Sequence, residues 1–403
     1  MRTRLYPALP TALLVSAYAL AASATVEPPA VSDARSAALG GTGVAYSDNG
    51  AAVFHNPAGL GSVGDGVLTL SLSPFLPQLS GPIAGTVEDS KRSFFPMFLA
   101  GGAYRLSDKL VAGLAVYPVF GFGAEYEGID ALGGQTLSMS AAAFEASPAI
   151  AYSITDDVTV AVGYRATYMI QQAKQVDVAA DAAGNPLLVS SEANLSGMNF
   201  LGAQVGLLVR VAEGTSLGFT YRNKTTVDLD GDTKVAGQSM DTSAEFATPH
   251  TFKVGVAQSL LDERLMLALD LKYALYSESS ETQAMTVEGV GTREVPLEWE
   301  DSISVSTGLE YRLAQTGPDL RVGYSVTTSA TSQDYPQPFL APPGLIHSVH
   351  AGTGMRFSDV AVDLGGYYMF SKENVEPAAD APGEPGEYGM NVYVVAVSAS
   401  YGF

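Results

Sequence analysis

The sequence predicts an all-β protein: a 14-stranded antiparallel transmembrane β-barrel with an N-terminal plug inside its lumen. Three observations predict this fold class. The chain begins with a short apolar leader, its later segments alternate apolar and polar residues, and its last strand ends in an aromatic residue. Alternation with period two is typical of strands that are apolar on one face. No stretch after the leader holds the roughly 20 consecutive apolar residues of a spanning helix, so strands must cross any membrane.

Residues 1–24 have the form of a signal peptide. Two arginines precede an apolar run that is short for a transmembrane helix, and Ala22-Ser23-Ala24 has the small-x-small pattern of a cleavage site. We therefore expect an exported chain that begins at Thr25.

The composition excludes several classes of protein. The chain has no cysteine, which rules out a disulfide framework, thiolate chemistry and a lipoprotein anchor. Its formal net charge of −21 makes nucleic acid a poor partner.

Residues 65–403 are expected to form the barrel. In the stretch from Asp157 to Ile170, one face carries seven apolar or aromatic residues and the other carries Thr159, Gly163 and Arg165. The same alternation predicts strands near 66–76, 93–106, 109–119, 143–154, 157–170, 197–211, 215–229, 246–259, 264–276, 301–313, 319–328, 347–357, 359–370 and 390–403. Tight turns alternate with long loops near 77–92, 120–142, 171–196, 230–245, 277–300, 329–346 and 371–389. An even strand number with short turns on one rim is typical of barrels in the bacterial outer membrane, surrounded by its lipid.

The last strand supports this localisation. Tyr393, Tyr401 and the terminal Phe403 lie on one face of an alternating segment. An aromatic end of this kind resembles the signal by which outer-membrane barrels are recognised for insertion.

Residues 25–64 are predicted to form the plug. They show no lipid-facing alternation, yet the part from Ala51 to Leu60 is too apolar for a solvated tail. A 14-stranded barrel has a bore wider than its own side chains fill, so the segment can be buried there. Asn56-Pro57-Ala58 disfavours a continuous helix and predicts a compact turn.

These features resemble the FadL/TodX family of outer-membrane transporters. The resemblance rests on Asn56-Pro57-Ala58 placed before fourteen strands, and on segments 147–168, 248–277 and 319–326. It implies passive uptake of hydrophobic small molecules such as long-chain fatty acids or hydrocarbons, without an enzymatic activity or a cofactor. A second function stays open, in which the barrel docks a periplasmic or surface protein and transports no small molecule.

The resemblance also implies a sideways exit at a kinked third strand. Pro118 lies in the third predicted strand and removes a backbone donor, and Gly121 follows it. We expect a strand kink here; the alternative is that Pro118 simply ends the strand.

Two groups of residues are candidate ligand contacts. The first is apolar and lies on the predicted loop 120–142, where it predicts either a ligand groove or loop packing: Phe120, Phe122, Tyr126, Leu132, Leu137 and Met139. The second is Arg165 and Arg222 on the inward face, which either hold a carboxylate head group or belong to a lumenal charge network.

No catalytic or metal site is predicted. His347 and His350 are three apart in a strand and point to opposite faces, and no nucleophile pattern accompanies the serines. His55 in the predicted plug is either a packing residue or a proton-sensitive gate.

Overall fold

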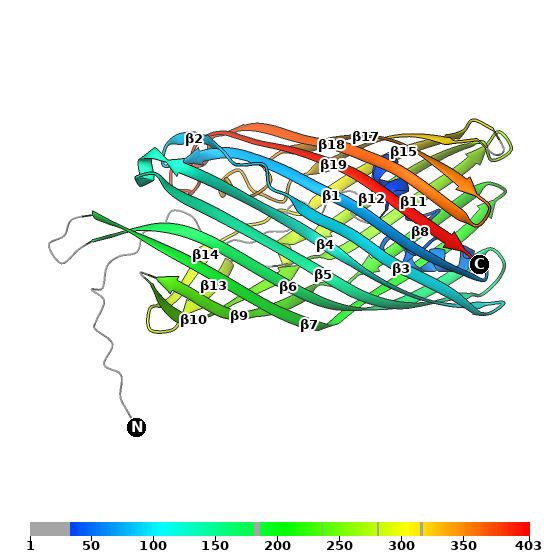
Figure 1. Ribbon diagram of the computed structural model, residues 1–403, viewed down its shortest axis with the longest axis horizontal. Helices are drawn as coiled ribbons and strands as arrows, with labels where there is room; N and C mark the ends of the chain where they lie inside the picture. Colours follow the sequence, from blue (N-terminus) through cyan, green and yellow to red (C-terminus); the bar gives the residue numbers. More distant parts are fainter. Residues whose placement is uncertain (1–32, 181–185, 236, 280–281, 315–316) are drawn as a thin grey trace, which may run out of the picture.

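The computed structural model describes residues 33–403 except 181–185, 236, 280–281 and 315–316, and forms a closed β-barrel (Figure 1). The predicted signal peptide, residues 1–24, and residues 25–32 of the predicted plug lie outside the described residues. The first and last strands close the barrel: β1 (Gly66–Ile83) pairs antiparallel with β19 (Gly386–Gly402). The predicted 14-stranded antiparallel barrel is confirmed.

Fourteen strands form the wall, and each pairs antiparallel with its neighbours. Between β1 and β19 these are β3 (Phe95–Ser107), β4 (Leu110–Ile129), β5 (Gln135–Ser153), β6 (Val158–Ala180), β7 (Pro186–Ala212), β8 (Thr215–Arg222), β11 (His250–Leu260), β12 (Leu265–Leu275), β15 (Ser302–Arg312), β16 (Asp319–Thr328), β17 (Leu345–Phe357) and β18 (Val360–Val375). Short turns join them at the end where the C-terminus lies (Figure 1).

Several predicted long loops are in fact strands, which corrects the sequence analysis. β4 to β7 continue beyond their predicted ends, and five further strands extend the same rim: β2 (Thr86–Asp89), β9 (Thr225–Val235), β10 (Gln238–Thr248), β13 (Thr282–Val287) and β14 (Gly291–Pro296). The predicted strands 215–229 and 246–259 are each divided, at 223–224 and at Pro249. Beyond a bilayer the outward face of a strand meets water, so the outward row of apolar residues ends while backbone pairing continues.

The wall is apolar outside and largely polar inside. Val162 of β6 points outward and is 61% exposed, whereas Thr159 of the same strand points inward and is 9% exposed. Leu267, Leu269 and Leu271 form the matching outward row on β12. This is the predicted assignment of faces. None of the described helices has the length and apolarity to cross a membrane.

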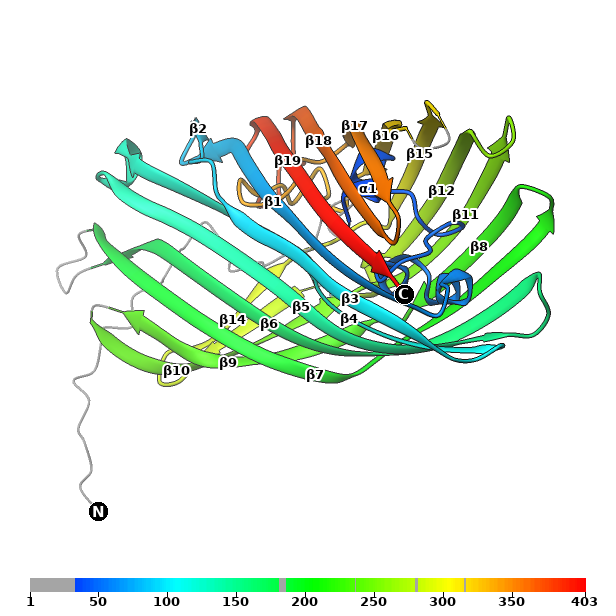
Figure 2. The ribbon, with the colours of Figure 1, turned by 45° about the vertical axis from the view of Figure 1, so that its right-hand side comes forward.

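The described N-terminal segment, residues 33–64, lies within the barrel near the end with short turns (Figure 2). Its helix α1 (Ala34–Ala38) contacts β16 to β19, and the 3-10 helix η1 (Pro57–Ser62) contacts β5, β6 and β7 on the other side. Between them, α2 (Ala52–His55) contacts β4 and β5. Small residues make this packing possible: a Cβ at Gly206 of β7 would lie 2.3 Å from the Asn56 side-chain oxygen.

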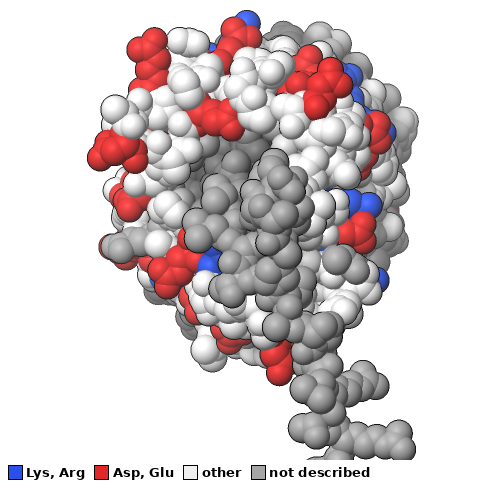
Figure 3. Space-filling model, turned by 90° about the vertical axis from the view of Figure 1, so that its left-hand side faces the viewer, with Lys and Arg blue, Asp and Glu red and all other residues white. Residues whose placement is uncertain are grey.

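The end with the long hairpins carries a large excess of negative charge. Figure 3 shows acidic side chains around the rim of its mouth. The described residues of this end hold 23 Asp and Glu but 7 Lys and Arg, counted over segments 76–94, 120–142, 171–176, 187–196, 223–249, 276–301, 328–346 and 371–389. Because short turns mark the periplasmic rim of such barrels, this acidic end faces outward from the cell.

Candidate ligand route and its lining residues

The ladder between β3 and β4 breaks part-way up the wall. Pairing runs from the short-turn end to Ala100 opposite Val116. Within the described part of the chain, no ladder pair joins the two strands beyond that point, where β3 pairs only with β1 and β4 only with β5. The two sides meet again where the Lys91 amide donates to the Glu125 carbonyl at 2.8 Å. We call the stretch between these two contacts, residues 95–99 and 117–123, the unpaired seam.

A bulge in β4 lies at the seam. Pro118 is opposite Phe144 of β5 and Phe120 is opposite Ala143, so Val119 is an extra residue in β4. Tyr117 before the bulge and Phe120 after it both point inward, which reverses the odd and even faces of the strand. Proline removes one backbone donor at the same place. β4 therefore has a bulge directly after Pro118, and the strand continues past it.

Side chains from β3 fill the seam against two glycines of β4. A Cβ at Gly121 would lie 2.7 Å from the terminal methyl of Met97, and one at Gly123 would lie 2.9 Å from the Phe95 ring. The flexible methionine is thus packed where backbone pairing is missing.

Five of the six apolar candidates from the predicted loop lie in wall strands and point inward. Phe120, Phe122 and Tyr126 belong to β4, Leu137 and Met139 to β5, and Leu132 to the 3-10 helix η2 (Asp130–Leu132) between them. All except the half-buried Phe122 are buried. The expectation of exposed loop residues is therefore wrong, because the bulge and the polar outward face hid the alternation of these strands.

An apolar crevice lies directly inside the seam. Its eleven lining residues are Phe75, Pro77, Leu79, Gly121, Phe122, Gly123, Phe339, Leu340, Ala341, Met390 and Val392. We call it the seam pocket. Phe339 to Ala341 come from the connection between β16 and β17, which packs inward: the Phe339 ring meets Tyr126 edge-on at 5.4 Å, and the Tyr126 hydroxyl donates to the Pro338 carbonyl.

Phe339, Leu340 and Ala341 line the seam pocket but were not predicted from the sequence. Their apolar run between prolines, in the stretch PQPFLAPP, was the available signal, since a solvated loop rarely carries one.

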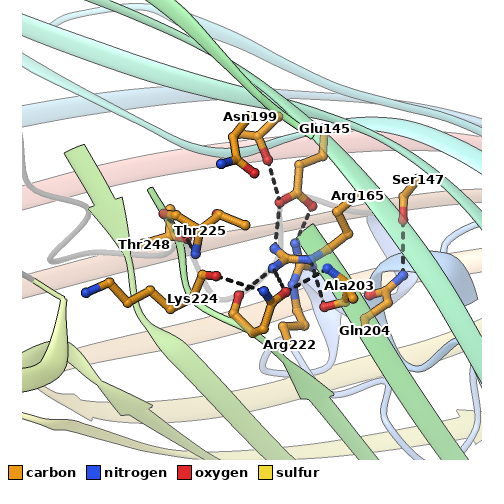
Figure 4. A network of polar contacts seen from close by, with 12 residues as sticks. Glu145, Ser147, Arg165, Asn199, Ala203, Gln204, Arg222, Lys224, Thr225 and Thr248 are labelled. Atoms are coloured by element: carbon orange, nitrogen blue, oxygen red, sulfur yellow. Dashed lines mark hydrogen bonds and ion pairs between the residues drawn. The ribbon is translucent and has the colours of Figure 1, made fainter. Parts of the chain in front are cut away.

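Arg165 and Arg222 converge on one carboxylate (Figure 4). The Arg165 guanidinium donates to Glu145 Oε1 at 2.7 Å, and Arg222 donates to Oε2 of the same group. Tyr117 donates to Oε2 at 3.1 Å, and Arg165 also donates to the Asn223 carbonyl at 2.5 Å. The two arginines therefore form a lumenal charge network centred on Glu145.

This network borders a second cavity. Phe120 and Val119 line it together with both arginines, Thr248, Pro249, Thr251 and Tyr276. Phe120 and Phe122 stack with ring centroids 6.3 Å apart. Phe120 thus borders the arginine-lined cavity, and Phe122, its neighbour on the same face of β4, borders the seam pocket.

Asn56 ties the N-terminal segment to the wall. Its amide donates to the Val44 carbonyl at 2.8 Å and to the Leu207 carbonyl of β7 at 2.9 Å, and its oxygen accepts from the Ala58 amide at 3.1 Å. Pro57 begins η1 and Ala58 is fully buried. The three residues form a structural joint.

A second ion cluster holds α1. Arg35 donates to both oxygens of Glu310 on β15 at 2.8 and 2.9 Å, and Arg321 links Glu310 to Asp363. Burial acts to lower the pKa of Arg35, but attraction to Glu310 raises that pKa well above its ordinary value. This arginine remains charged at any pH the protein meets.

Asp33 caps α1. It accepts from the Ser36 amide at 2.7 Å and from the Asn49 side chain at 3.1 Å. Burial acts to raise the pKa of Asp33, but attraction to His55 and these hydrogen bonds outweigh it and hold the pKa below its ordinary value. Among the described residues, no group of three His, Asp or Glu side chains comes close enough to hold a metal ion.

A family model, described as outer membrane protein transport protein (OMPP1/FadL/TodX), matches residues 12–403. The chain belongs to this family. Solved structures agree in fold: a FadL homologue of Pseudomonas aeruginosa has 14% identity and a TM-score of 0.79 over 92% of this chain and 98% of its own. The toluene transporter TodX of P. putida has 18% identity and a TM-score of 0.75 over 92% and 98%.

The toluene transporter TbuX of Ralstonia pickettii is similar as well, with 17% identity and a TM-score of 0.71 over 92% of this chain and 98% of its own. A search of curated proteins gave no match. This OMPP1/FadL/TodX barrel is therefore an outer-membrane protein of a family of transport channels.

Proposed function

We propose that the barrel takes up hydrophobic small molecules passively and releases them sideways through the unpaired seam. The observation that carries the proposal is the position of the seam pocket, an apolar crevice inside the one stretch of the β3–β4 boundary that lacks ladder pairs. Gly121 and Gly123 belong to both features. An apolar molecule in the pocket is separated from the lipid by the Met97 and Phe95 side chains.

The N-terminal segment acts as a plug that directs substrate to the seam. Support comes from its burial and from its anchors on both sides of the barrel, Arg35 to Glu310 and Asn56 to Leu207. A molecule entering at the acidic end meets this segment before it reaches the periplasmic rim. The proposed role involves no chemical step and no cofactor.

Uptake measurements test the function. Cells that lack their own channel of this family should accumulate radiolabelled toluene or oleate faster when they carry this chain, whichever of the two it accepts. In planar bilayers, a variant that lacks residues 25–62 should have a higher conductance than the full-length protein. Accumulation of neither compound would contradict the uptake function, and unchanged conductance would contradict the plug.

A further inference from the structure

We propose that this route rejects organic anions and carries uncharged hydrophobic molecules. The proposal rests on the proposed uptake function and names the class of substrate that it serves. It excludes carboxylates such as fatty-acid anions at neutral pH. Three features of the described residues carry it: the charge of the mouth, the chemistry of the seam pocket and the pairing of the nearby cations.

The mouth repels anions. Its described residues carry 16 more negative than positive charges, since 23 acidic residues stand against 7 basic ones. A rim of one sign raises the local concentration of oppositely charged solutes and lowers that of like-charged ones. Salt screens this field over about 10 Å at 0.1 M ionic strength, so the rim discriminates most strongly in dilute media.

The seam pocket offers an anion no partner. None of its eleven described lining residues has a charged or hydrogen-bonding side chain. A carboxylate entering it would lose its hydration without gaining a donor, which is costly in free energy, while a hydrocarbon loses nothing. This second barrier does not depend on salt.

The cations beside the route already have acceptors. Arg165 and Arg222 share Glu145, as described above. At the upper end of the seam, Lys91 pairs with Glu125 at 3.5 Å and with Glu127.

Arg92, the next cation, lies over the Tyr393 ring with 4.8 Å to its centroid, and donates to the Gln78 side chain at 3.0 Å. Each of these cations thus already contacts an acceptor or a ring of the protein, which weakens its attraction for an anionic head group.

A matched pair of substrates tests the selectivity. Radiolabelled dodecanol and dodecanoate have the same chain length, and only the acid is ionised near neutral pH. In cells that lack related channels, the uptake that depends on this protein should be at least tenfold higher for dodecanol than for dodecanoate, a difference of about 1.4 kcal/mol. Uptake of the anion equal to that of the alcohol would overturn the proposal while leaving the uptake function intact. Uptake of neither compound would overturn this proposal, and the toluene measurement above then decides separately whether the uptake function stands.

Two lysine variants locate the selectivity. Leu340→Lys places a cation in the seam pocket and should raise dodecanoate uptake and lower dodecanol uptake. Leu187→Lys adds the same charge at an exposed position of the same end and should leave the ratio unchanged. In the wild-type protein, raising salt from about 10 mM to about 0.3 M should increase dodecanoate uptake alone. Equal responses of the two lysine variants, or a ratio unaffected by salt, would contradict the assigned locations.

Discussion

Glu145 of β5 and Arg165 of β6 form a salt bridge of 2.7 Å in the barrel interior, with side chains 1% and 3% exposed. Arg222 of β8 completes the cluster from two strands further on. Three wall strands are thus joined by charged side chains below the seam pocket. Such a cluster is held together by Glu145, because without it two buried guanidinium groups would face each other.

Glu145→Gln should destabilise the barrel strongly. Removing one partner of a buried ion pair typically costs about 3–5 kcal/mol, because the other charge stays buried without compensation. Urea unfolding in lipid vesicles, followed by fluorescence of the single Trp299, measures the loss. Glu192→Gln is the matched control, since Glu192 pairs with Lys174 on the surface and should cost about 0–1 kcal/mol. Equal losses would refute the role of the cluster.

Asn56→Ala should loosen the N-terminal segment without unfolding the wall. The substitution removes the hydrogen bonds to the buried Val44 carbonyl and to the part-buried Leu207 carbonyl, a loss of about 1–3 kcal/mol. Planar-bilayer recordings should show larger or more frequent openings than the wild-type protein. Asn374→Ala, on the exposed face of β18, should record like wild type. Identical recordings from both variants would show that Asn56 does not help the N-terminal segment to close the pore.

Acid should release the same segment through Asp33. Because the folded pKa of Asp33 lies below its unfolded value of about 3.9, the ionised group stabilises fully above about pH 4. That contribution is lost as the pH falls through the lowered folded pKa. Conductance should therefore rise below about pH 4. The acid response should be smaller in Asp33→Ala, and a full response in that variant would assign it to another group.

Two outward-facing residues of β6 test where the membrane boundary lies along the barrel. Val162 and Gln172 both point outward, the first among apolar neighbours and the second near Lys174. Val162→Arg should cost about 2–4 kcal/mol at the bilayer centre, and Gln172→Arg about 0–1 kcal/mol beyond it. Vesicle refolding yields and urea midpoints measure both. If the Gln172 variant is as unstable as the Val162 variant, the bilayer extends further toward the acidic end than we predict.

The membrane part of the fold was predictable because lipid imposes period-two alternation on every strand. Val158 to Ile170 shows it without interruption, and the predicted strand matches the membrane part of β6. Strand ends were not predictable where the outward face becomes polar. Phe120 and Phe122 were placed in a loop because Val119 shifts the inward face by one residue, which destroys the pattern used to find strands.

From the sequence, the types of residue that line the site could be predicted, but not which of them contact one another. Inward alternation identified Arg165 and Arg222 as lumenal, but their common partner depends on the register of β5, β6 and β8. The seam pocket unites residues from β1, β4, β19 and the connection after β16, which no local pattern relates. Which of these residues meet is decided by the pairing of strands that lie far apart in the sequence.

Cross-linking the seam tests the central claim, sideways release, most directly. The chain has no cysteine, so Met97→Cys with Gly121→Cys places two unique thiols across the seam. The Met97 side chain itself spans this gap, and a short reducible bis-thiosulfonate linker should span it too.

Tyr104→Cys with Ala112→Cys is the control, because this directly paired site lies on the intact part of the same ladder. We expect linkage of 97 to 121 to stop dodecanol uptake, reduction to restore it, and linkage of 104 to 112 to change nothing. Full uptake through a barrel completely linked between 97 and 121 would contradict sideways release.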